Sequence, residues 1–159
     1  MNTEVQSICK NLQNILDGNP WFGRPVYTIL NEIHPVTVYT KPGENSHSII
    51  DLLYHIITWA EFTAKRLEKA KETDMHAFEQ LDWRLIDPHI HTWSNALQQF
   101  KVAHEQILKL LQTRDDNFLQ EKVDYREYNF RVLLNGLIQH DIYHLAQIAY
   151  VKKLLSPEN

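Results

Sequence analysis

Apolar residues recur every three or four positions along most of this chain, which is the spacing of amphipathic helices. Glycines and prolines, which interrupt helices, cluster between the periodic segments. Residues 72–86 have no sustained period and are predicted to form a loop that holds at most a short helix. The pattern predicts four long helices and one short one, over about residues 3–17, 25–33, 46–69, 87–111 and 124–155.

Polar residues mark where these helices are expected to begin. Thr3 fits the first position of a capping box, with a glutamine three residues later. Ser46 or Ser48 is expected to cap the third helix, and Asp87, which precedes a proline, the fourth. The fifth helix is predicted to start near Asp124. Together these elements indicate an all-α protein, an up-and-down four-helix bundle with one short extra helix.

Length and composition narrow the function classes. The 159 residues suit a single domain, 1–159, with a core of its own. A formal net charge of −4 and a pI near 6.1 argue against nucleic acid or an anionic membrane as the main partner. There is no apolar run of about 18 residues to span a bilayer, and the first residues lack the features of a signal peptide. With Cys9 as the lone cysteine, a cytoplasmic protein is expected.

The most informative local feature is the pair His140 and His144 in the predicted last helix. A spacing of four residues places both imidazoles on one face, one turn apart, where they can bind one ion. Leu133, Leu137 and Ile148 fall on the same stripe, so both histidines occupy positions where core-facing side chains are expected.

A helix bundle builds ion sites from side chains on facing helices, so a third ligand is expected from another helix. His55 is the candidate, because it lies midway along the predicted third helix between core positions. Three neutral imidazoles that leave one coordination position open suit Zn²⁺, Ni²⁺ or a similar divalent transition metal. The alternative is that these histidines are hydrogen-bonded, partly buried residues without an ion.

Neighbouring residues have two interpretations each. Asp51, one turn before His55, either accepts the free ring N–H of that histidine or caps the helix. His104 is either a core residue satisfied by a neighbour or a group that supports the site or contacts substrate. Trp59 is a core aromatic or the wall of a pocket. No residue is marked as an acid or a base, so the catalytic residues stay unassigned.

Three stretches carry a family resemblance. Residues 45–59 hold a central histidine, residues 134–148 hold His-x-x-x-His followed by a glutamine, and residues 18–23 form an early loop rich in aromatic residues. Taken in chain order, these stretches resemble the DinB/YfiT-like superfamily, small bacterial four-helix bundles with a three-histidine metal site. The resemblance covers nearly the whole chain and implies that His55, His140 and His144 are the metal ligands.

The resemblance implies a function class and leaves the reaction open. Family members include thiol-dependent S-transferases and isomerases, and proteins described as metal-dependent hydrolases. We therefore expect a metal-dependent enzyme acting on a small molecule, with S-transfer from a low-molecular-weight thiol first and hydrolysis second. The alternative is a non-catalytic bundle that binds metal or a ligand. An open coordination position facing a pocket favours the enzyme.

A homodimer is also expected. Dimers are common in the family, and the last predicted helix has a second apolar band beside the histidine stripe: Phe130, Leu134, Ile138, Ile142, Leu145 and Ala149. A contiguous apolar patch rarely stays exposed on a monomer. The alternative is that the short second helix and residues 72–86 cover this band within one chain.

Overall fold

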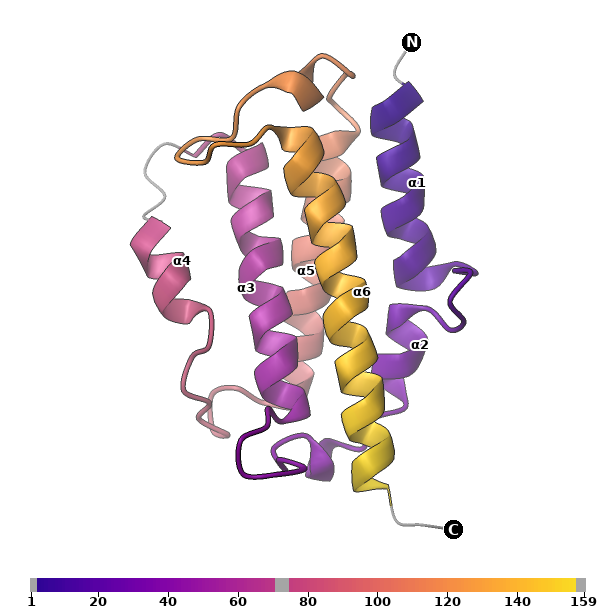
Figure 1. The fold of residues 1–159 in the computed structure, drawn as a ribbon, viewed down its shortest axis with the longest axis vertical. Helices are drawn as coiled ribbons and strands as arrows, with labels where there is room; N and C mark the ends of the chain where they lie inside the picture. The colour runs from indigo at the N-terminus through magenta and orange to yellow at the C-terminus, as the bar shows by residue number, and fades with distance from the viewer. Residues whose placement is uncertain (1–2, 71–74, 157–159) are drawn as a thin grey trace.

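The computed structural model describes residues 3–70 and 75–156, and within them every regular element is a helix. Four long helices pack together, and two short α-helices and two 3₁₀ turns connect them (Figure 1). The predicted all-α bundle is confirmed. The elements are α1 (Thr3–Asp17), α2 (Val26–Asn31), η1 (Pro35–Thr37), α3 (Ile49–Leu67), α4 (Met75–Leu81), α5 (Trp93–Leu111), η2 (Phe118–Gln120) and α6 (Phe130–Leu155).

Helices α3 and α5 run in the same direction rather than alternating as a strict up-and-down order expects (Figure 1). The Tyr54 ring near the start of α3 packs against His91, just before α5. At the other end, Arg114, just after α5, donates to the carbonyl oxygen of Leu67. The connection between these helices must therefore return along the length of the bundle, and it contains α4.

Helix α3 is the centre of the core. Fifteen of its 19 residues are buried, so it is covered on nearly every side. Its neighbours are α5, α6 and α4. This central position explains why the third segment is apolar almost all round. A histidine in the middle of α3 is consequently held among packed side chains.

The start of α5 differs from the sequence prediction. The helix begins at Trp93, and the Thr92 side chain accepts a hydrogen bond from the backbone N–H of Asn95. Asp87 instead accepts from the backbone N–H of His89 within a separate turn. The prediction that Asp87 caps this helix was wrong, because the same side-chain chemistry stabilises turns and helix starts.

The start of α6 was also predicted too early. Asn129 is the N-cap and accepts from the backbone N–H of Val132. Asp124 lies in a tight loop before it, in which Tyr125 adopts a left-handed backbone conformation with φ of 62°. A non-glycine residue with such a φ cannot continue a right-handed helix.

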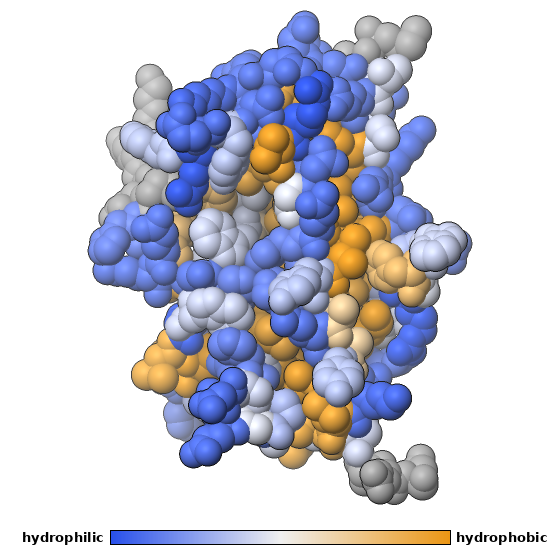
Figure 2. Space-filling model, viewed as in Figure 1, coloured by the Kyte–Doolittle hydropathy of each residue, from blue (hydrophilic) through white to orange (hydrophobic). Residues whose placement is uncertain are grey.

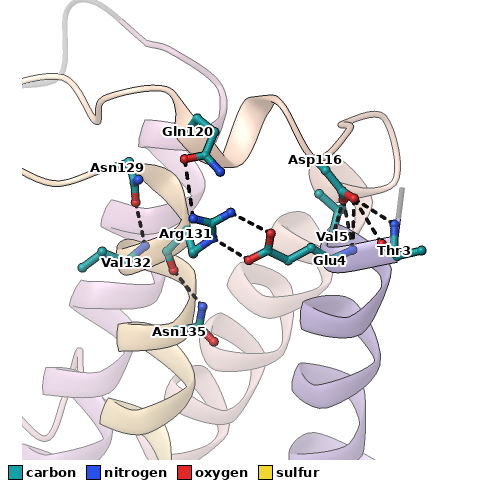
Figure 3. A network of polar contacts seen from close by, with 9 residues as sticks. All are labelled: Thr3, Glu4, Val5, Asp116, Gln120, Asn129, Arg131, Val132 and Asn135. Atoms are coloured by element: carbon teal, nitrogen blue, oxygen red, sulfur yellow. Dashed lines mark hydrogen bonds and ion pairs between the residues drawn. The ribbon is translucent and has the colours of Figure 1, made fainter. Parts of the chain in front are cut away.

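Helix α1 takes its cap from a distant residue, not from a capping box at Thr3 (Figure 3). The Asp116 carboxylate accepts hydrogen bonds from the backbone N–H groups of Thr3, Glu4 and Val5, the last at 2.9 Å. At the same end of the bundle, Arg131 of α6 pairs with Glu4 through Nη2 and Oε2 at 2.8 Å. These contacts fix α1 against α6.

The second apolar band of α6 is largely covered within the single chain. Helix α6 packs mainly against α3, α1 and η2. This cover removes the exposed patch that motivated the dimer. The covering elements differ from the short second helix and residues 72–86 that the sequence suggested. The dimer itself stays a prediction. Four of the six band residues are buried and two are partly buried: Phe130, Leu134, Ile138 and Leu145, then Ile142 and Ala149.

No described helix combines the length and the apolarity that crossing a membrane requires.

Candidate metal centre

Three histidines that are far apart in sequence come together between α3 and α6. His55 lies on α3, and His140 and His144 lie one turn apart on α6. One ring nitrogen from each lies within 4.8 Å of the other two. The Nε2 atoms of His55 and His140 are 2.9 Å apart. The structure thus assembles the three residues that the sequence singled out.

Side-chain partners fix which nitrogen of two rings is free. The Nδ1–H of His55 donates to Oδ1 of Asp82 at 2.7 Å. The Nδ1–H of His144 donates to Oε1 of Gln147 at 2.6 Å. Both acceptors require the proton on Nδ1, so the Nε2 lone pair of each ring is left for another partner. This is the usual arrangement in which an outer acceptor orients a metal-binding histidine.

The environment keeps the three imidazoles neutral. Burial is the main cause that lowers the pKa of each, and it brings the pKa of His140 to about 3. The neighbouring rings lower the pKa of His140 further, because a second positive charge nearby is unfavourable. Histidine binds a metal only in its neutral form, so the site is in the binding form at neutral pH.

This donor set fits a divalent transition metal. With Zn–N bonds of about 2.0–2.1 Å, two ligands of a tetrahedral ion lie roughly 3.3 Å apart. The nitrogen separations here begin at 2.9 Å and reach at most 4.8 Å, so small side-chain shifts suffice. The Nδ1 atom of His140 is buried without a hydrogen-bond partner. Three histidines leave a fourth coordination position open.

Asp82 and Trp83, which sequence analysis missed, come from the connection between α4 and α5. Asp82 accepts from His55 and also from the indole N–H of Trp59, the latter at 2.6 Å. The Trp83 ring stacks on His55 with a centroid separation of 4.0 Å. His47 stacks on the opposite face of Trp83 at the same separation. The indole of Trp83 therefore shields one side of the site.

The loop that carries these residues is fastened to α3. The Thr58 hydroxyl donates to the carbonyl oxygen of Leu81, and Arg84 Nη2 donates to Thr58 Oγ1 at 2.6 Å. The Arg84 guanidinium also lies 5.0 Å from the centre of the Tyr54 ring. Residues 81–84 have no helical period, so nothing in their pattern predicts these contacts. The parallel arrangement of α3 and α5 carries this segment past His55.

The structure decides between the two interpretations of Asp51 and between the two of His104. Asp51 does not orient His55; its carboxylate accepts from the backbone N–H and hydroxyl of Ser48 in a capping box. His104 is a core residue that contacts Asp141 at 2.9 Å, and both side chains are buried. Asp141 directly follows the candidate ligand His140 on α6 but pairs with α5. Burial raises the pKa of Asp141.

The remaining histidines lie outside the cluster. His34 starts η1, where its Nδ1 accepts from the backbone N–H of Val36, and His76 contacts Gln80. His89 is exposed.

An apolar cavity of about 260 Å³ adjoins the cluster. It lies between the C-terminal half of α3 and the N-terminal half of α6, in the upper part of the view in Figure 2, where apolar side chains reach the surface. His140 belongs to its wall. Trp59 also lines it, which agrees with the sequence interpretation of Trp59 as the wall of a pocket. The lining residues are Trp59, Phe62, Thr63, Tyr128, Val132, Leu133, Gly136, Leu137 and His140.

The sequence model of the DinB superfamily matches residues 26–148, which is most of the chain. This protein belongs to the DinB superfamily. The matched region contains all three histidines of the cluster and the segment that carries Asp82. Comparison with curated proteins and with solved structures gave no match.

Proposed function

We propose that this DinB superfamily member is a metal-dependent enzyme that acts on a small molecule. The observation that carries the proposal is the convergence of three neutral imidazoles beside an apolar cavity that shares His140 with them. Three protein ligands with an open position are typical of catalytic metal sites, whereas structural sites are closed by four.

Each residue of the site has a role in this proposal. His55, His140 and His144 hold a divalent ion, with Zn²⁺ or Ni²⁺ favoured by the nitrogen donors. Such an ion lowers the pKa of a bound thiol or water, or polarises an acceptor group. Asp82 orients the His55 ring, and the indole of Trp83 keeps water from one face of it.

Transfer of a thiol to an electrophile is the favoured reaction. The sulfur of a low-molecular-weight thiol forms a bond to an electrophilic carbon, the bond from that carbon to its leaving group breaks, and the thiol proton leaves with that group. Hydrolysis is the second candidate. It is less favoured because Oδ1 of Asp82, the carboxylate that contacts the cluster, is already held by both His55 and Trp59.

The test is elemental analysis of the purified protein and of three variants, His55→Ala, His140→Ala and His144→Ala. We expect about one ion per wild-type chain and a large loss in each variant. His89→Ala, which removes an exposed histidine outside the cluster, is the control and should keep the ion. Equal metal content in all five proteins would contradict the site.

A second measurement separates the enzyme from the non-catalytic alternative. The protein loaded with Co²⁺ is titrated with a small thiol, and the near-ultraviolet sulfur-to-cobalt absorption is followed. The enzyme is expected to gain this absorption and to transfer the thiol to a generic electrophile. A bound ion that never acquires a sulfur ligand would favour a metal-binding bundle without this activity.

A further inference from the structure

The cavity beside His140 is lined almost entirely by carbon. Aromatic rings come from Trp59, Phe62 and Tyr128, and α6 supplies aliphatic side chains. The Thr63 hydroxyl is already donated to the carbonyl oxygen of Trp59 at 2.8 Å, so it offers no free donor. Apart from the neutral imidazole of His140, no ionisable nitrogen or carboxylate contributes to the described lining.

Gly136 lines this cavity at a position where neither the backbone nor the packing requires a glycine. It lies one turn before His140 inside α6, where glycine is less favourable to a helix than alanine. Its backbone does not require glycine, because its φ is not positive. A Cβ atom built there would meet no atom within 4 Å. The missing side chain therefore leaves open space, and that space belongs to the cavity.

The cavity is coupled to the candidate metal centre through two side chains. The His140 ring lines the cavity while its Nε2 lies 2.9 Å from Nε2 of His55. Trp59 also lines the cavity, and its indole N–H donates to Asp82, which holds His55. A molecule in the cavity thus contacts the candidate ligand His140. It also contacts Trp59, which holds the Asp82 carboxylate behind His55.

We propose that this cavity binds the apolar body of the electrophilic substrate, and that Gly136 sets the size of the body it accepts. This inference rests on the proposed function and adds the substrate class. A cavity of about 150 Å³ accommodates benzene, so 260 Å³ suits a bicyclic aromatic or a branched alkyl group of similar size. The reactive carbon lies at the His140 end, and the polar thiol approaches from outside the cavity.

The alternative occupant is a second copy of the chain. Val132 at the cavity is about half exposed, at 53%, but the α6 band that suggested a dimer is covered by the chain's own helices. The described lining residues shape a volume suited to one small molecule and include no charged side chain to anchor a partner. A small apolar molecule is therefore the occupant that the lining favours.

The test compares Gly136→Leu with Ala146→Leu, which makes a similar increase in size at an exposed position of the same helix. Toluene and naphthalene are the probes, and ligand-observed NMR measures their binding to the metal-loaded proteins. Wild type and Ala146→Leu should bind naphthalene, and Gly136→Leu should lose at least tenfold in affinity with unchanged metal content. In Gly136→Ala the affinity for toluene should stay closer to the wild-type value than the affinity for naphthalene. This variant should melt at the same temperature as wild type or at a higher one.

Equal naphthalene affinity in wild type and Gly136→Leu would overturn the inference. Light scattering tests the other occupant: a wild-type mass near twice 18.9 kDa that falls to 18.9 kDa in Gly136→Leu would assign the cavity to a dimer interface and overturn it as well. Failure of the proposed function gives a different result, namely protein without metal that still binds naphthalene in a Gly136-dependent way.

Discussion

At the scale of single residues, Asp82 connects several features of the site. One carboxylate accepts from the His55 ring and from the Trp59 indole, and the adjacent Trp83 ring covers His55. Removing an acceptor behind a metal-binding histidine leaves the ring free to rotate and makes it less basic. The chemistry of the site thus depends on a loop residue that need not contact the ion.

We predict that Asp82→Ala lowers metal affinity by about 10- to 100-fold. The reason is that His55 loses the partner that fixes its tautomer and orientation. Competition with a chromophoric chelator measures the change. Asp51→Ala is the control, because Asp51 lies on the helix that carries His55 but caps it with Ser48 instead of contacting the ring. It should lower the melting temperature without changing metal affinity. A larger affinity loss in the Asp51 variant would refute the assignment.

At the scale of elements, helix ends in this protein are stabilised from outside the helix as well as from within. Helix α1 is capped by Asp116, which lies more than a hundred residues away in sequence. The carboxylate satisfies N–H groups that have no partner inside the helix, and its charge is favourable at a helix N-terminus. The three N–H groups hold the pKa of Asp116 below its usual value.

We therefore expect Asp116→Ala to lower the melting temperature by about 2–5 °C, the range for loss of a helix cap in a protein of this size. Metal content should stay the same, since α1 lies outside the cluster. Differential scanning calorimetry measures the shift. Asp124→Ala removes an exposed carboxylate in the loop before α6 and should change the melting temperature little. Equal shifts in the two variants would count against the cap.

The helices were predictable from the sequence where packing determines them, and not where turns compete. The three-and-four spacing located α3 and α6 and placed His55, His140 and His144 on inward faces. The predicted starts of α5 and α6 were wrong. Asp87 and Asp124 have side chains that can cap a helix, but they do not lie at the first turn of one. Asp82 could not be found, since only the packing of its loop on α3 brings it to His55.

At the scale of the whole molecule, a neutral histidine cluster makes stability depend on pH. Burial lowers the pKa of His55 and His144, and that of His140 to about 3, whereas histidine in an unfolded chain titrates near 6.5. Between these values the unfolded chain binds protons that the folded chain does not. The free energy of unfolding of the metal-free protein should therefore fall as pH falls below about 6.5, and these groups have no effect above it.

We predict that chelator-treated wild type loses more stability between pH 7 and pH 5 than His140→Phe, which cannot take up that proton. One group contributes at most about 1.4 kcal/mol per pH unit. Urea unfolding at several pH values measures the difference. Asp141, whose raised pKa acts in the opposite sense, is present in both proteins, so it does not decide the comparison. Parallel pH profiles would show that folding does not lower the pKa of His140.

The distribution of the three histidines along the chain has a consequence for biosynthesis. His55 and His140 are 85 residues apart, and ribosomes add about 5–20 residues per second. The first histidine therefore leaves the ribosome several seconds before the other two, and during that time the nascent chain has no complete ligand set. Because the ligand set is incomplete until the last helix has been synthesised, an ion held by all three histidines could not guide the folding of the nascent chain before that point.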